Sequence, residues 1–181
     1  MDYYDHEDNV REYAKMAEGY DGVLLIEVLR KHLPAGSTVL ELGMGPGKDL
    51  DMLSPDYKVT GSDTSRVFLD IYKRTHPSAD LLLLDATSID VDRTFDCIYS
   101  NKVLIHLAKA ELRASFRRQA AALNRRGLAM HSFWYGDRED EEHYGLRFRY
   151  YTEVDLLGLA SDAFEVVEMA VSYTHLRAHE T

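Results

Sequence analysis

The sequence predicts a single α/β domain built on a doubly wound, mainly parallel β-sheet. Three observations support this fold class. Short apolar runs of strand length alternate with helical patterns over residues 38–169. Three glycines, Gly43, Gly45 and Gly47, follow the first of these runs directly. The chain has 181 residues, which is long enough for one domain with a substantial core.

Two helices are expected before the sheet. Apolar residues spaced i, i+3, i+4 and i+7 from Val10 are typical of a helix with one buried face, and Gly19 is expected to end it. Asp21 is expected to cap a second helix. We therefore divide the chain into an N-terminal helical cover at residues 1–36 and a sheet domain at residues 37–170.

The sheet domain is expected to contain six strands, at residues 38–42, 57–61, 81–84, 95–99, 127–134 and 164–169. Helical patterns lie between them, the last beginning at a capping Thr152. The continuously apolar run Leu81–Leu84 is interpreted as a strand covered on both faces. The long acidic connection from Tyr135 to Tyr151 is interpreted as an irregular lid or loop.

The composition of the chain excludes several classes of partner and of site. Asp and Glu number 31 against 21 Lys and Arg, and this net charge of −10 disfavours a nucleic-acid partner. A single cysteine, Cys97, excludes an internal disulfide, and the scattered histidines lack metal-ligand spacing, so no metal is expected. The N-terminus is unlike a signal peptide, and no apolar run approaches the roughly 20 residues that span a bilayer. We therefore expect a cytoplasmic protein without a membrane partner.

The glycine segment carries the strongest functional signal. A buried strand leads into it and a helix begins directly after it. Glycine allows the backbone to turn sharply and to approach a ligand closely. The spacing of these glycines excludes two other kinds of nucleotide-binding site. A dinucleotide fingerprint needs glycine where Lys48 stands, and a P-loop needs glycine at Leu42 and Ser or Thr at Asp49.

An acidic residue, Asp63, ends the second expected strand, 18 residues beyond Gly45. In doubly wound sheets, an acid at this position accepts hydrogen bonds from the hydroxyl groups of a ribose. The alternative role for Asp63 is the N-cap of the following helix. The spacing favours the ribose role.

Together these residues resemble the motifs of class I S-adenosylmethionine-dependent methyltransferases, and the resemblance extends to about Met169. It implies S-adenosylmethionine as the cofactor. The segment Glu41–Gly47 resembles the first motif, which implies that the glycine loop lies beside the methionine part of the cofactor and Glu41 near its ammonium group. Asp63 matches the ribose-binding acid, and Asp85 with Ala86 resembles the adenine site.

The same resemblance implies further site residues. Phe95–Asn101 resembles the fourth motif, so Asn101 is expected near the transferable methyl group. Tyr20 resembles an aromatic residue that closes over the cofactor. His106 is the candidate catalytic base, with a structural histidine as the alternative. The family's last antiparallel strand has no counterpart, and residues 171–181 are expected to lie outside the native fold.

The resemblance therefore predicts an enzyme that moves a methyl group to an O, N or C atom of a small molecule by in-line displacement. The alternative is an S-adenosylmethionine-binding module without turnover. The fourth motif lacks an Asn/Asp-Pro-Pro-Tyr pattern, which disfavours amide and base-amine acceptors. The aromatic residues near the end of the fifth strand either form an acceptor pocket or pack as core, and Arg147 or Arg149 could meet an acidic acceptor. The acceptor's identity and the oligomeric state stay open.

Overall fold

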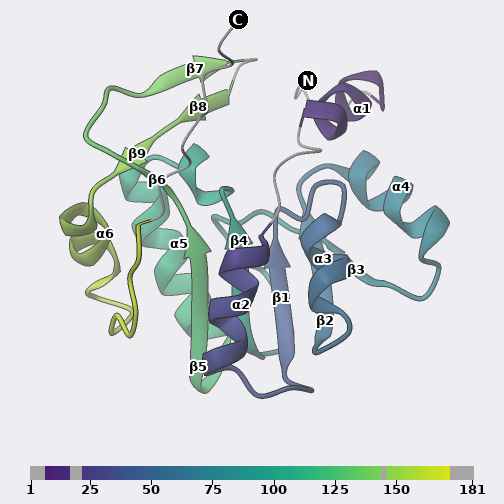
Figure 1. Cartoon of the computed structure of the whole chain (residues 1–181), viewed down its shortest axis with the longest axis horizontal. Helices are drawn as coiled ribbons and strands as arrows, with labels where there is room; N and C mark the ends of the chain where they lie inside the picture. Colours follow the sequence, from purple (N-terminus) through teal and green to yellow (C-terminus); the bar gives the residue numbers. More distant parts are fainter. Residues whose placement is uncertain (1–6, 17–21, 144–145, 172–181) are drawn as a thin grey trace, which may run out of the picture.

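A computed structural model describes residues 7–16, 22–143 and 146–171 (Figure 1). Its main sheet has five strands, all paired in parallel, in the order β3-β2-β1-β4-β5. Their bounds are β1 Thr38–Leu42, β2 Lys58–Asp63, β3 Asp80–Leu83, β4 Phe95–Asn101 and β5 Leu123–Ser132. The doubly wound parallel sheet predicted from the sequence is therefore confirmed. The strand order reverses between β1 and β4, and ligands bind at the carboxyl ends of strands at such a point.

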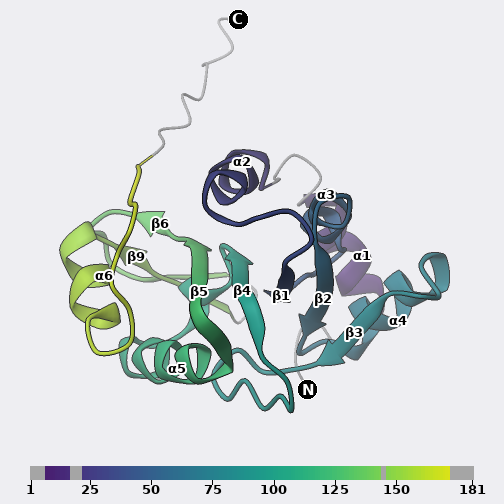
Figure 2. The same ribbon diagram turned by 90° about the horizontal axis from the view of Figure 1, so that it is seen from below.

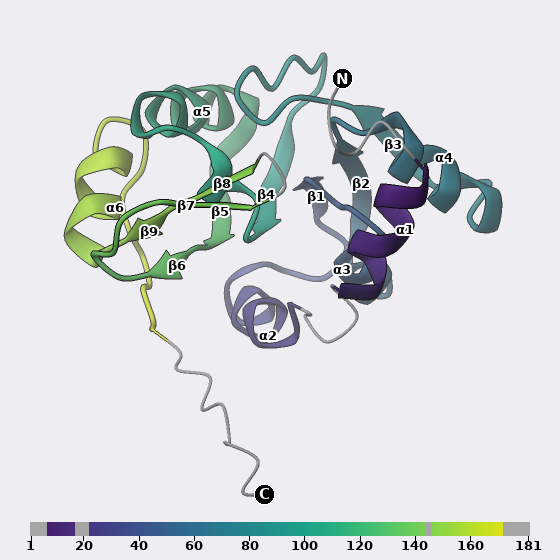
Figure 3. The ribbon, with the colours of Figure 1, turned by 90° about the horizontal axis from the view of Figure 1, so that it is seen from above.

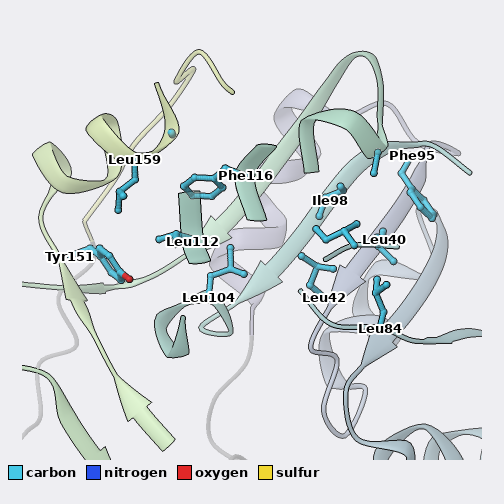
Figure 4. Packing of buried hydrophobic residues seen from close by; sticks show 13 residues of the cluster. Leu40, Leu42, Leu84, Phe95, Ile98, Leu104, Leu112, Phe116, Tyr151 and Leu159 are labelled. Carbon is cyan, nitrogen blue, oxygen red and sulfur yellow. The ribbon is translucent and has the colours of Figure 1, made fainter. Parts of the chain in front are cut away.

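Helices cover both faces of the sheet. Helices α2 (Val23–His32) and α3 (Lys48–Leu53) lie on one face, and α5 (Lys109–Ala122) lies on the other (Figure 2). Successive side chains of a strand point to opposite faces of the sheet, so each strand contributes apolar side chains to the core on both faces. In β1, Val39 packs toward α2 with Leu29, whereas Leu40 joins the core under α5 with Phe116 (Figure 4).

The other helices are α1 (Glu7–Met16), α4 (Arg66–Thr75), α6 (Glu153–Ala160) and the short 3-10 helix η3 (Leu104–His106). The predicted cap of α6 is confirmed, because the Thr152 hydroxyl accepts from the Asp155 amide and the Asp155 carboxylate accepts from Thr152 in return. Helix α2 follows Gly22 as its N-cap, while Gly19 and Asp21 lie outside the described residues.

Two expectations about the strands are wrong. Residues 164–169 form no strand, because the described sheet ends at β5 and supplies no neighbouring ladder for this segment. The segment is instead held near α2, where His32 Nε2 lies 2.7 Å from Glu168 Oε2. The run Leu81–Leu84 is not covered on both faces, because β3 is an edge strand and Leu83 is 52% exposed. Residues 172–181 lie outside the described residues.

The connection after β5 is more regular than expected. Strand β5 ends at Ser132, and two short strand pairs follow. Strand β6 (Trp134–Tyr135) pairs in parallel with β9 (Tyr150–Tyr151), and β7 (Glu141–His143) pairs antiparallel with β8 (Leu146–Phe148). Viewed onto the carboxyl edge of the sheet, the β7–β8 hairpin lies on the side of β4 and β5, and α1 on the side of β2 and α4 (Figure 3). In the part of the chain described, no helix has the length and apolar character to cross a membrane.

Candidate functional site

The glycine loop leaves β1 at Leu42, and all three glycines have positive φ, at 63°, 50° and 88°. A Cβ on Gly43 would lie 2.6 Å from Val103, and a Cβ on Gly47 would lie 2.3 Å from the Tyr72 ring. A Cβ on Gly45 would meet nothing within 4 Å. Gly43 and Gly47 are therefore required by packing within the protein, whereas Gly45 borders open space.

Asp63 is attached to the loop at the middle glycine, Gly45. Its Oδ2 accepts a hydrogen bond from the Gly45 amide at 2.9 Å, and its Oδ1 accepts one from the Ser65 amide at 2.8 Å. The N-cap alternative for Asp63 is wrong, because the side chain of Ser65 caps α4. The buried Asp63 carboxylate is thus fixed beside the open space at Gly45.

Glu41 is buried on the opposite side of β1 from Leu40 and Leu42. Its side chain is only 3% exposed, and Oε2 has no hydrogen-bond partner in the described structure. Burial, followed by the negative charges of Asp49 and Asp63, raises the pKa of Glu41 well above its ordinary value. A buried oxygen without a donor is costly, so this carboxyl group suits a cationic ligand group that would supply one.

Asp49 connects three parts of the site, and sequence analysis missed it. Its Oδ1 accepts from the Gly22 amide at 2.9 Å. Its Oδ2 accepts from the Tyr99 hydroxyl at 2.7 Å and from Asn101 Nδ2 at 3.0 Å. This buried carboxylate therefore joins the start of α2, the start of α3 and the end of β4. Its only signal in the sequence is an acidic residue just after the glycine loop.

Three residues expected at the other ends of the cofactor, Asn101, Asp85 and Ala86, lie at the same edge of the sheet. Asn101 is fixed by Asp49 and by the Ser132 hydroxyl, which donates to its Oδ1 at 2.6 Å. The Leu84 amide donates to the Asp63 carbonyl at 3.0 Å, and this contact brings the following Asp85 and Ala86 close to Asp63. Asp85 is exposed and accepts from Thr87. Tyr20 lies outside the described residues.

Two histidines near β4 and β5 differ in their contacts. Both ring nitrogens of the half-buried His131 are engaged, with Ser100 Oγ at 2.8 Å and Gln119 Oε1 at 2.7 Å. Desolvation lowers the pKa of His131 to about 3, so it is a neutral packing residue. His106 is half-buried, and among the described residues only its Nδ1 has a partner, the Arg147 carbonyl oxygen at 3.0 Å. Among residues 7–16, 22–143 and 146–171, no group of acidic, histidine or cysteine side chains is arranged to hold a metal ion.

These features fit the cofactor that the sequence resemblance implies. The open space at Gly45 leaves room for a ligand against the backbone, and the fixed Asp63 carboxylate can accept from hydroxyl groups beside it. The unpartnered Glu41 oxygen suits an ammonium group. The residues present therefore suit S-adenosylmethionine, which carries both kinds of group.

Comparison with known proteins agrees with the geometry. Residues 39–127 match a family profile described as "Methyltransferase domain". The chain is 37% identical over 79 residues to a trans-aconitate 2-methyltransferase of Variovorax paradoxus, covering 41% of this chain and 30% of that protein. It is 32% identical over 98 residues to a tRNA (carboxymethyluridine(34)-5-O)-methyltransferase of Saccharomyces cerevisiae, covering 54% and 35%. These matches span about a third of the length of the curated relatives.

Solved structures share the fold. The 1,6-didemethyltoxoflavin-N1-methyltransferase of Burkholderia thailandensis, solved with bound 1,6-didemethyltoxoflavin and S-adenosylhomocysteine, superposes with a TM-score of 0.71 at 20% identity. The superposition covers 86% of this chain and 72% of that one. Residues 39–127 therefore form a methyltransferase domain, and the sheet order and the superposition give the chain the fold of this solved methyltransferase.

Proposed function

We propose that this protein is an S-adenosylmethionine-dependent methyltransferase that acts on a small molecule. The observation that carries the proposal is the combination of open space at Gly45, a carboxylate fixed beside it at Asp63, and a buried unpartnered oxygen on Glu41. Among the described residues, no packing contact requires a glycine at position 45, whereas packing contacts do so at Gly43 and Gly47.

Each part of the cofactor has a proposed partner. Glu41 holds the ammonium group, Asp63 the ribose hydroxyls, and Asp85 with Ala86 the adenine. Asn101 and Tyr20 border the methionine end. The bound cofactor supplies a methyl group on a positively charged sulfur. The protein's contribution is to hold the acceptor in line and to exclude water, which can lower a barrier by roughly 7–11 kcal/mol.

The acceptor is proposed to be a small molecule. One curated relative is named for trans-aconitate and one structural neighbour for 1,6-didemethyltoxoflavin. Another relative is named for tRNA, but the net charge of −10 disfavours a nucleic-acid acceptor here. We also propose a cytoplasmic location, a helical cover at residues 1–36 over a methyltransferase domain at 37–170, and a tail at 171–181 outside the native fold.

Titration calorimetry with S-adenosylhomocysteine tests the cofactor site. In Asp63→Asn, one acceptor oxygen is lost at the ribose position, so we expect binding about tenfold weaker. Wild type should also bind the 2′-deoxy analogue more weakly than S-adenosylhomocysteine, and this discrimination should shrink in Asp63→Asn. The control is Asp70→Asn, at an exposed position of α4.

The same titration can refute the assignment. A wild-type protein that binds NAD but neither S-adenosylmethionine nor S-adenosylhomocysteine would show that the proposed ligand is wrong. Methyl transfer from S-adenosylmethionine into a panel of small acceptors then tests turnover. Binding without transfer to any acceptor would favour a binding module over an enzyme.

A further inference from the structure

His106 lies close to the glycine loop although it is not part of it. It is the last residue of η3, and the N-cap of this short helix is Val103, the residue that a Cβ on Gly43 would meet at 2.6 Å. Helix η3 follows Asn101 by three residues, so the carboxyl end of β4 leads directly to it. His106 is therefore placed at the edge of the sheet where the acceptor must approach the methyl group.

The hydrogen bond of His106 determines which ring nitrogen carries the proton. Its partner is the backbone carbonyl oxygen of Arg147, which can only accept. Nδ1 must therefore be the donor, and in the neutral ring the lone pair belongs to Nε2. No described residue donates to Nε2. The ring thus presents an unprotonated nitrogen, unlike His131, whose two nitrogens both have partners.

The surroundings of the ring keep it neutral near pH 7. Burial lowers the pKa of His106, the hydrogen bond to the Arg147 carbonyl raises it in part, and the positive charge of Arg149 lowers it, so that the net shift is downward. Arg149 is itself paired with Asp140, its Nε lying 3.1 Å from Asp140 Oδ2. Among the described residues, Arg149 is the charged group that affects the pKa of the His106 ring. The Phe148 ring packs edge-on against the His106 ring, with ring centroids 4.8 Å apart.

Three hydrogen bonds fix η3 against Arg147 in β8 and Arg149, which directly follows β8. Besides the bond from Nδ1, the Arg149 amide donates to the Ile105 carbonyl at 3.1 Å, and Arg149 Nη1 donates to the His106 carbonyl at 2.8 Å. The position and the tautomer of the ring are therefore set before an acceptor arrives, which is what a base requires for efficient proton transfer.

An aromatic surface continues from the ring. Trp134 stacks on Phe148 with centroids 5.1 Å apart and planes inclined by 20°, and Tyr150 lies 5.4 Å from Trp134. These side chains are half-buried and come from three different strands, β6, β8 and β9. A surface of stacked rings favours a flat ligand that can extend the stack.

We propose that His106 Nε2 is the general base of the reaction and that the acceptor is a planar aromatic molecule bearing an O–H or N–H group. This inference rests on the proposed methyltransferase function. The acceptor atom gives its proton to Nε2 as its electron pair bonds to the methyl carbon. The electron pair of the broken carbon–sulfur bond stays on sulfur, and the resulting imidazolium later releases its proton to water.

The tautomer can be tested without turnover. Long-range ¹H–¹⁵N spectra of the wild-type chain, with S-adenosylhomocysteine added, should show His106 protonated at Nδ1 and not at Nε2 above its pKa. That pKa should lie below the ordinary value of about 6.5. A ring protonated at Nε2 in its neutral form would overturn the proposal, whether or not an acceptor has been found.

The base role is tested with His106→Asn. The Asn side chain can still donate to the Arg147 carbonyl from Nδ2, but it offers no basic nitrogen. We expect unchanged S-adenosylhomocysteine affinity and a loss of about 10²–10⁴-fold in kcat with phenols and N–H heteroaromatics. The wild-type kcat should fall as pH drops through the pKa of His106, because Nε2 becomes protonated, and the variant should lack this decline. His32→Asn, at a surface histidine paired with Glu168, is the control.

The outcomes separate this inference from the proposed function. Failure of wild type to bind S-adenosylhomocysteine would refute the cofactor site, not the tautomer. Binding with an unchanged rate and pH profile in His106→Asn would refute the base. A carboxylate acceptor has no proton to remove at neutral pH, so preferential methylation of carboxylates, unaffected by His106→Asn, would refute the acceptor class. Binding without transfer to any phenol or N–H heteroaromatic would refute it as well.

Discussion

Gly47→Ala is expected to destabilise the fold by about 3 kcal/mol, the sum of overpacking and left-handed backbone strain. The added Cβ would lie 2.3 Å from the Tyr72 ring, and φ at this position is 88°. Tyr72 has little freedom to move, because its hydroxyl donates to Asp51 at 2.5 Å and its ring stacks on His76. In a domain of this size, the loss should lower Tm by roughly 6–12 °C.

Gly45→Ala is expected to behave differently. Its φ of 50° makes a side chain cost about 1–2 kcal/mol, but the added methyl group meets no protein atom within 4 Å. It instead fills the space assigned to the cofactor. Steric cost in the bound state should weaken S-adenosylhomocysteine binding by roughly 10–100-fold.

The matched control is Gly36→Ala, in the turn before β1. Gly36 also has a positive φ, 83°, and a Cβ there also meets nothing within 4 Å. It should therefore lose stability as Gly45→Ala does while keeping full affinity. Thermal unfolding and calorimetry on the three variants measure both quantities. Equal affinity in Gly45→Ala and Gly36→Ala would show that the loop does not contact the cofactor.

Glu41→Gln is expected to gain stability and lose binding. The raised pKa means that the folded protein holds this carboxyl group protonated more strongly than the unfolded chain does. Stability due to Glu41 is therefore fully present below its ordinary pKa, near 4.5, and is lost as pH rises through the raised pKa. Glutamine does not ionise, so the variant should be the more stable protein at higher pH.

Binding should change in the opposite direction. An ionised Glu41 paired with an ammonium group forms a charge-assisted hydrogen bond worth about 1.5–3 kcal/mol, so its loss should weaken binding roughly 10–100-fold. Wild type should also release a proton on binding, and Glu41→Gln should not. Urea unfolding at about pH 4 and about pH 8 checks the stability difference. Calorimetry in buffers of different ionisation enthalpy checks proton release.

The exposed Glu27→Gln on α2 is the control for both measurements, because it removes one negative charge from the surface and none from the buried cluster. A Glu41→Gln protein that is less stable than wild type at every pH would show that Glu41 has a structural role instead. Unchanged affinity in this variant would remove Glu41 from the cofactor site.

Sequence reasoning succeeded where the signal was local. The glycine loop, the strand before it and the helix after it are contiguous, and Asp63 ends the neighbouring strand in the register that the alternation implies. The cap at Thr152 is likewise read from four consecutive residues. These elements place the loop and Asp63 at the carboxyl edge of the sheet without further information.

Contacts between residues far apart in the sequence could not be predicted from local patterns. Asp49 acquires its role from partners 27, 50 and 52 residues away, which no spacing rule connects. The exposure of β3 follows from its edge position, and the missing strand at 164–169 follows from the absence of a neighbour beyond β5 in the described sheet. The pairing of β7 with β8 converts an apparent acidic loop into a hairpin.

The hydrogen bonds that attach η3 to Arg147 and Arg149 affect how the surrounding surface can change by mutation. Two of these three bonds end on carbonyl oxygens of the main chain at Ile105 and His106, and the third ends on the carbonyl of Arg147, whose own side chain is exposed. Replacement of the Leu146 or Arg147 side chain leaves these carbonyls in place. Neighbouring surface chemistry can therefore be altered by mutation while the imidazole keeps its orientation, so selection or design could retune substrate preference here without rebuilding the reaction centre.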